Sequence, residues 1–200
     1  MKKVIVSSLL ILVHLTLWGQ IPTVYLPDSF AIDGVLFKEN QENNTIQMPA
    51  VDLNRYIVED RRQDAGNNPY RFGAPISTSI NFIESATRAV IGENAVWKLK
   101  IASKNAVSLN VVFDKMELPV EGSLFIYNEK GNVVEGPITQ LLILNTKEFS
   151  STVFYDSILF LEYIQPLSIR ISPKITITQV VHGYRRYQES DGDYGIGCVI

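Results

Sequence analysis

Alternation of apolar and polar residues across positions 92–164 constrains the fold more than any other feature of the chain. Near its start, Trp97, Leu99 and Ile101 fall on one side of an extended backbone, and the lysines between them fall on the other. Residues 107–113 repeat the pattern with valine, leucine and phenylalanine. A period of two is typical of strands that bury one face, so this region predicts the body of a β-sandwich.

Further strands are predicted within and around this region. Residues 124–127 and 133–134 flank a loop that contains a glycine, which predicts a hairpin. Residues 158–164 form the most apolar segment, and residues 76–82 and 175–180 also have strand character. Eight to ten short strands separated by turn signals favour an all-β fold, a jelly-roll-like antiparallel β-sandwich with a short N-terminal helix.

Residues 1–20 have the composition of a signal peptide. Lys2 and Lys3 supply a basic start, and residues 4–17 are mostly apolar. As a helix, that apolar run is too short to cross a bilayer core of about 30 Å. We therefore expect a cleaved signal and export to the periplasm, cell surface or medium, with no membrane contact after cleavage. An uncleaved N-terminal anchor is the alternative.

The remaining chain divides by composition into three parts. Residues 21–48 are mixed and polar and predict an exposed lead-in segment. Residues 49–187 contain the predicted sandwich. Residues 188–200 are polar and rich in glycine, so they predict a linker.

A short helix is predicted just before the first strand of the body. Leu53, Tyr56 and Ile57 share one helical face, and Asp60 is expected to point towards solvent. Residues 60–69 are charged and contain glycine and asparagine, so they predict a loop.

Net charge argues against a nucleic-acid partner. The formal charge is −3 and the isoelectric point is near 5.4. No run of lysine or arginine is longer than two residues, so no basic stripe follows a phosphate backbone.

The residues needed for catalysis and for metal binding are scarce. His182 is the one histidine outside the expected signal peptide, and Cys198 is the one cysteine. A Ser-His-Asp triad would have to use His182. Its sequence context instead predicts a surface or half-buried residue of a strand. No zinc-ligand spacing, phosphate-binding loop or dinucleotide motif occurs, so we predict no catalytic, metal or cofactor site within these residues.

Glu162 is an acidic residue in the middle of the most apolar predicted strand. Its neighbours on the same strand face are apolar, which predicts partial burial with a partner. Arg71 and Arg88 are the arginines proposed for that role, which would make Glu162 structural.

Cys198 is an odd thiol in a chain expected to be exported. Its position near the end predicts a disulfide partner beyond Ile200. A free buried thiol is the alternative.

The order of several segments resembles a known family. Along the chain these are RFG, GENAVWKLKIASKNAVSLNVVF, LPVEGSLFIYNEKG, GPIT, LFLEYIQP, VVHGYRRY and DYGIGC. Together they resemble the region upstream of the protease domain in bacterial secreted lysyl-endopeptidase-like, trypsin-like serine proteases. The resemblance covers roughly residues 49–198, and order and spacing carry it rather than any one motif.

This resemblance implies a β-rich pro-segment whose partner is its own downstream protease domain. Residues 188–200 would then hold the linker and the start of that downstream domain, and Cys198 would resemble the first cysteine of the mature enzyme. The catalytic His, Asp and Ser of such a hydrolase would lie beyond Ile200. The resemblance also implies that Arg185 and Arg186 form an exposed processing region before the linker. A solvated charged pair is the alternative interpretation of these two arginines.

A different class of function fits the same strands. A free-standing secreted β-sandwich that binds carbohydrate or a cell surface would need an exposed aromatic platform. Trp97 and Tyr127 are the candidates for it, although Trp97 fits a core position better. An independent hydrolase is disfavoured by the shortage of histidine.

Overall fold

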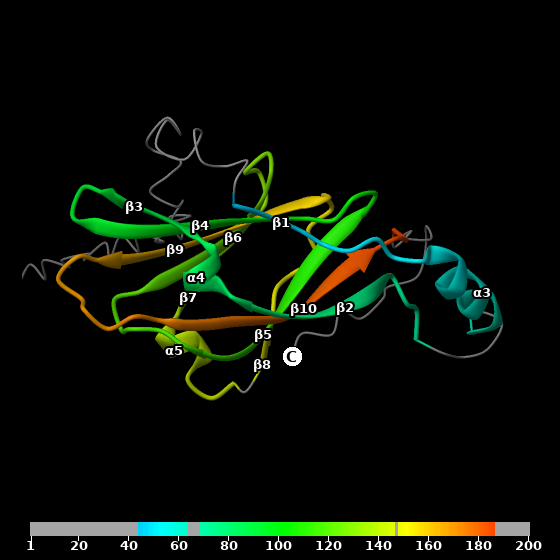
Figure 1. Ribbon diagram of the computed structural model, residues 1–200. Coiled ribbons are helices and arrows are strands. Elements are labelled where there is room, and N and C mark those ends of the chain that lie inside the picture. The colour runs from blue at the N-terminus through cyan, green and yellow to red at the C-terminus, as the bar shows by residue number, and fades with distance from the viewer. Residues whose placement is uncertain (1–43, 64–68, 147, 187–200) are drawn as a thin grey trace, which may run out of the picture.

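A computed structural model describes residues 44–63, 69–146 and 148–186. The predicted signal peptide, most of the lead-in, the linker and Cys198 lie outside these residues. Figure 1 shows two stacked sheets, with α3 (Leu53–Gln63) beyond the end where β10 (Lys174–Gly183) finishes. The first sheet, sheet A, contains β1 (Thr45–Gln47), β3 (Thr87–Ile91), β4 (Asn94–Ala102), β6 (Ser123–Asn128), β7 (Val134–Thr139) and β9 (Ile158–Pro166). The second, sheet B, contains β2 (Gly73–Asn81), β5 (Ser108–Glu117), β8 (Glu148–Ser150) and β10.

The strand pairing is that of a jelly roll. Among the eight strands β2, β4, β5, β6, β7, β8, β9 and β10, the first pairs with the last, and the second pairs with the seventh. The third pairs with the sixth, and the fourth pairs with the fifth, all antiparallel. This is the order produced when one long hairpin folds over into two sheets, so the predicted jelly-roll-like sandwich is confirmed.

The core lies between the two sheets. Trp97, Leu99 and Ile101 point into it from β4, as their alternation predicts. Side chains from sheet B, including Phe113, meet them there. Two short helices close gaps in this layer: α4 (Phe82–Ser85) inserts Phe82, and α5 (Gln140–Ile143) inserts Ile143. Burial of these apolar side chains is the main term that stabilises the body.

One strand departs from the antiparallel pattern. Thr45–Gln47 forms β1 and pairs with β4 in parallel, and Met48 is buried in the core. The last residues of the predicted exposed lead-in therefore belong to the sandwich.

The helix before the body is longer than the sequence predicts. α3 continues to Gln63, through residues expected to be a loop. Two local interactions account for this extension. An ion pair of 3.2 Å joins Arg55 Nε to Glu59 Oε1 one turn apart, and Arg61 and Arg62 lie at the negative end of the helix dipole.

Candidate functional site

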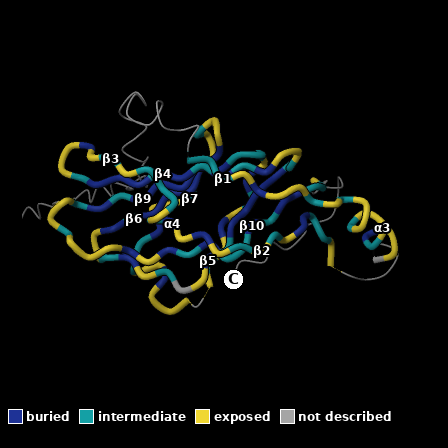
Figure 2. The backbone as a smooth tube through the Cα atoms, viewed as in Figure 1, coloured by how far each residue is buried: buried dark blue, intermediate teal, exposed yellow. Residues whose placement is uncertain are grey.

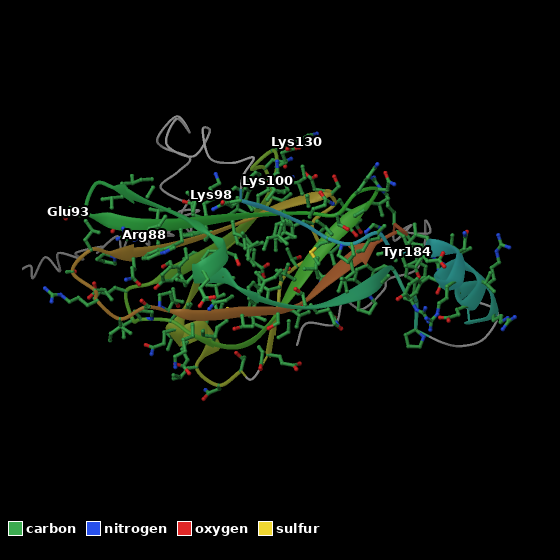
Figure 3. The ribbon with its side chains drawn as sticks, in the orientation of Figure 1. Arg88, Glu93, Lys98, Lys100, Lys130 and Tyr184 are labelled. Atoms are coloured by element: carbon green, nitrogen blue, oxygen red, sulfur yellow. The ribbon has the colours of Figure 1, made fainter. Side chains whose placement is uncertain are left out.

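The predicted processing region begins immediately after β10. Figure 3 labels Tyr184, the first residue after the strand, at the end of the sandwich nearest α3. The backbone N–H groups of Tyr184 and Arg185 both donate to the carbonyl oxygen of Phe72, at 3.0 and 3.1 Å. The exit from the body is therefore fixed against the residue that precedes β2.

A buried carboxylate on α3 holds the same exit. Tyr184 Oη donates to Asp60 Oδ2 at 2.6 Å, and Arg185 Nη1 lies 3.2 Å from that oxygen. Arg71 Nε lies 3.6 Å from Asp60 Oδ1. We call Asp60, Arg71, Tyr184 and Arg185 the α3 clasp. Two cations and a phenol offset the desolvation of one acid, so the clasp ties the helix to the end of β10.

Charges at the rim of the clasp reinforce it. Arg71 Nη1 lies 3.0 Å from Glu59 Oε2, and this hydrogen bond lowers the pKa of the Glu59 carboxyl. Burial raises the pKa of Tyr184 above its ordinary value, and the hydrogen bond to Asp60 raises it further. The phenol therefore keeps its proton and remains a donor at neutral pH.

Aromatic rings cover both arginines of the exit. The Arg185 guanidinium lies 4.1 Å from the centroid of the Tyr70 ring, and that of Arg186 lies 5.8 Å from the centroid of Tyr155. Tyr70 Oη also donates to the carbonyl oxygen of Arg186, at 3.0 Å. These contacts add cation–π attraction to the ion pairs of the clasp.

The two predicted processing residues therefore differ in environment. Only 26% of the Arg185 side chain is exposed, because it is paired with Asp60, so it is not the solvated charge of the alternative interpretation. Arg186 is exposed. A trypsin-like protease must take the arginine side chain into its specificity pocket, so Arg185 has to leave the clasp before cleavage after it. Cleavage at either residue stays a prediction.

Asp60 lies on a different side of α3 from the one that the sequence pattern predicts. It was expected to face solvent, but it is buried and faces the body. A usable signal was present, because Asp60 lies four residues after Tyr56 and three after Ile57, which places it on the predicted inward face. Its partners could not be found from the sequence, since Tyr184 is separated from it by 124 positions.

His182 is buried in β10, so its predicted surface or half-buried position is wrong. Its Nδ1 lies 2.7 Å from Ser103 Oγ, which is also buried. Burial lowers the pKa of His182, so the ring is neutral at pH 7. No carboxylate is hydrogen-bonded to His182 among the described residues. A substrate carbonyl cannot reach the Ser103 hydroxyl in this enclosed position, so the pair joins β10 to the end of β4 as a structural contact.

Glu162 is fully buried, but its partners differ from those predicted. It accepts a hydrogen bond of 2.8 Å from Tyr127 Oη, and it lies opposite Lys98 in the β4–β9 register. The two arginines proposed for it are engaged elsewhere. Arg71 belongs to the α3 clasp, and the Arg88 guanidinium lies 5.2 Å from the centroid of the Trp97 ring.

The opposite end of the sandwich, near α5, has a different character. A groove of about 730 Å³ is bordered by the end of β5, by α5 and by the loop before β10. Val120, Leu144 and Ile171 line it and are exposed.

The described ranges give no metal or membrane feature to add. No group of three or more His, Cys, Asp and Glu side chains in these ranges is arranged to hold a metal ion. Likewise, no helix of that part of the chain combines the length and apolar character needed to cross a membrane. No family model matches the chain.

Proposed function

We propose that residues 49–187 are the non-catalytic pro-domain of a secreted, trypsin-like serine endopeptidase precursor. In this proposal the signal peptide directs export, and the catalytic domain follows beyond Ile200. The partner of the pro-domain is its own downstream protease domain, and Cys198 belongs to that domain.

The observation that carries this proposal is the α3 clasp on the exit from the body. A pro-domain has to present the junction to the next domain in a defined position. Asp60 and the Phe72 carbonyl hold Tyr184 and Arg185 rigidly, while Arg186 is exposed beside the expected linker. This arrangement suits a junction that remains intact during folding and is cut afterwards. The resemblance in segment order, which includes VVHGYRRY, supports the same interpretation.

Two further observations favour a pro-domain over the other classes of function. The Ser103–His182 contact is closed to substrate, which disfavours an independent hydrolase. Trp97 and Tyr127 are 9% and 4% exposed, so neither contributes to an exposed aromatic platform for sugars.

The test uses the catalytic domain encoded after residue 200. That domain is refolded alone or with the purified chain added in trans, and amidase activity on a lysyl substrate is measured. The chain is also added to the enzyme after folding. We expect either more recovered activity in the first assay or inhibition in the second. The chain by itself should hydrolyse neither lysyl nor arginyl substrates.

A matched control distinguishes the folded domain from added protein in general. In Gly122→Val, the new Cβ would lie 2.0 Å from the Oη of buried Tyr163, which disrupts the core. This variant should have neither effect. If the parent chain and Gly122→Val behave alike in both assays, the proposed function is wrong.

A further inference from the structure

The outer face of sheet A carries aromatic and charged side chains in two rows. Phe125, Glu162 and Lys98 lie directly opposite one another across β6, β9 and β4. Tyr127, Phe160 and Lys100 form the adjacent row in the same way. Directly paired residues of antiparallel strands point to the same side, so all six side chains share this face, opposite the core.

These side chains contact one another closely. The Tyr127 and Phe160 rings stack with centroids 5.5 Å apart. Lys98 Nζ lies 4.9 Å from the centroid of Phe160, and Tyr127 Oη donates to Glu162. The face is therefore an apolar surface that carries two lysines and one hydrogen-bonded acid.

The aromatic residues of this face are buried, although no described helix covers them. Less than a tenth of each of these residues is exposed: Phe125, Tyr127, Phe160 and Glu162. In Figure 1, α3 lies beyond the end of the sheets, whereas α4 and α5 contribute residues to the core on the other side of sheet A. Figure 2 shows dark blue along β4, β6 and β9. An outer face of a two-layer sandwich has this burial only when another segment lies on it.

We propose that residues 21–43 cover the outer face of sheet A. The chain enters the described structure beside this face, at Asn44, whose side chain donates to Thr87 Oγ1. Thr87 lies opposite Lys98 in the β3–β4 register, so it points to the same side. β1 pairs with β4 only from Lys100 onwards, because β3 occupies the same edge of β4 before that point. β1 therefore cannot continue along this edge of β4 before Thr45, and the hydrogen bond to Thr87 holds Asn44 at the border of the outer face.

Length and chemistry of the segment match the surface. At about 3.3 Å per extended residue, it is several times longer than the width of four strands spaced about 4.8 Å apart. It contains apolar residues that match the aromatic rows: Val24, Tyr25, Leu26, Phe30, Ile32, Val35, Leu36 and Phe37. Its charged residues are Asp28, Asp33, Lys38, Glu39 and Glu42, an excess of acid.

The charges on the face are of the opposite sign. Figure 3 shows Lys98, Lys100 and Lys130 on this side of the molecule. Burial of acidic residues near these lysines would be offset by ion pairing. Composition alone predicts that this segment is an exposed lead-in. Its apolar and acidic residues support the proposal that it covers sheet A instead.

The first test cross-links the full, unmodified chain with a carbodiimide, which joins a carboxylate to a nearby lysine without a spacer. Peptide mapping of the monomer fraction should find Lys98 or Lys100 joined to an acidic residue within 21–43. Two results would overturn the proposal: links from these lysines to other carboxylates only, or links found only in the dimer fraction, which would identify a second copy as the cover.

The second test compares two double variants of the full chain. Phe30→Ser with Phe37→Ser removes apolar anchors, and Asn40→Ser with Gln41→Ser is the matched polar control. The acetylation rate of Lys98 should rise several-fold in the first variant and stay at the parent value in the control. Lys174, whose side chain is 73% exposed, should react equally in all three proteins, which controls for the reagent. Equal midpoints of urea unfolding show that the body is folded in all three. Equal Lys98 rates in both double variants would contradict the cover.

Discussion

The two ends of the sandwich use their side chains in opposite ways. At the α3 end, two arginines and a tyrosine surround the buried Asp60 carboxylate. These contacts fix three separate chain segments relative to one another. At the α5 end, Leu141 is 83% exposed, and Leu144, which lines the groove, is 64% exposed. Pairs of specific charges fix positions and orientations, whereas apolar contacts at an open surface do not. We therefore expect changes in the clasp to affect stability and chain exit, and changes to the exposed apolar side chains at the α5 end to have little effect on folding.

Among the side chains that distinguish the two ends, the acid of the clasp is expected to have the largest effect when it is removed. Asp60→Ala leaves Arg71 and Arg185 without their shared partner, which costs about 2 kcal/mol in the free energy of unfolding, because both cations keep some contact with water. Chemical denaturation measures this loss. Asp114→Ala, at an exposed acidic position on β5, is the control and should change stability by less than about 0.5 kcal/mol. Equal losses in the two variants would show that the clasp contributes nothing specific.

Access to the exit should change in the same variant. In the parent chain, limited digestion with trypsin should cut after Arg186 faster than after Arg185, because Arg185 is held by Asp60 and Tyr70. Asp60→Ala should raise the rate of cleavage after Arg185 several-fold and leave that after Lys174 unchanged. Mass spectrometry of early products gives both rates. A parent chain already cut fastest after Arg185 would mean that the clasp does not protect it.

A smaller, pH-dependent effect is expected from His182, near the α3 end. Burial lowers its pKa in the folded state, so the unfolded state binds more protons once the pH falls below about 6.5. Stability should therefore decrease as pH falls from 6.5 towards the lowered folded value, with a slope of at most about 1.4 kcal/mol per pH unit for one proton. His182→Gln should flatten this part of the profile in urea titrations. An unchanged slope in the variant would assign the effect to another group.

The smallest effect is expected at the α5 end. Leu141→Ser removes an exposed side chain that loses little contact with water on unfolding, so the free energy of unfolding should change by less than about 0.5 kcal/mol. Ile143→Ser, two residues later, is the internal comparison because Ile143 is buried, and it should cost about 2 kcal/mol or more. If Leu141→Ser is as destabilising as Ile143→Ser, the contrast between the two ends is wrong.

Local patterns allowed much of the body to be predicted from the sequence. Alternation assigned the inward residues of β4 correctly, and the glycine-containing loop correctly predicted the pairing of β6 with β7. These features depend on neighbours within a few positions. Strand number and turn signals favoured a jelly-roll-like sandwich without giving the strand order, and the pairing of the first with the last strand agrees with that fold.

The candidate site was harder to predict because it depends on distant partners. Arg185 and Arg186 were identified only through the family resemblance, and nothing in their sequence separates the held residue from the exposed one. Glu162 was expected to be partly buried with a partner, and it is fully buried. Its neighbours Lys98 and Tyr127 follow from strand register, which the sequence does not specify. An ion pair between elements can be predicted only after the fold has brought those elements together.

The measurement that tests the proposed function most directly is the coding sequence that follows the codon for Ile200, read together with the mass of the exported product. A pro-domain requires an open frame that continues through further cysteines into His, Asp and Ser motifs of a trypsin-like protease. The proposed function also predicts an exported enzyme that has lost residues 49–187. A stop codon immediately after Ile200, with an exported product that retains the sandwich as an independent protein, would contradict it.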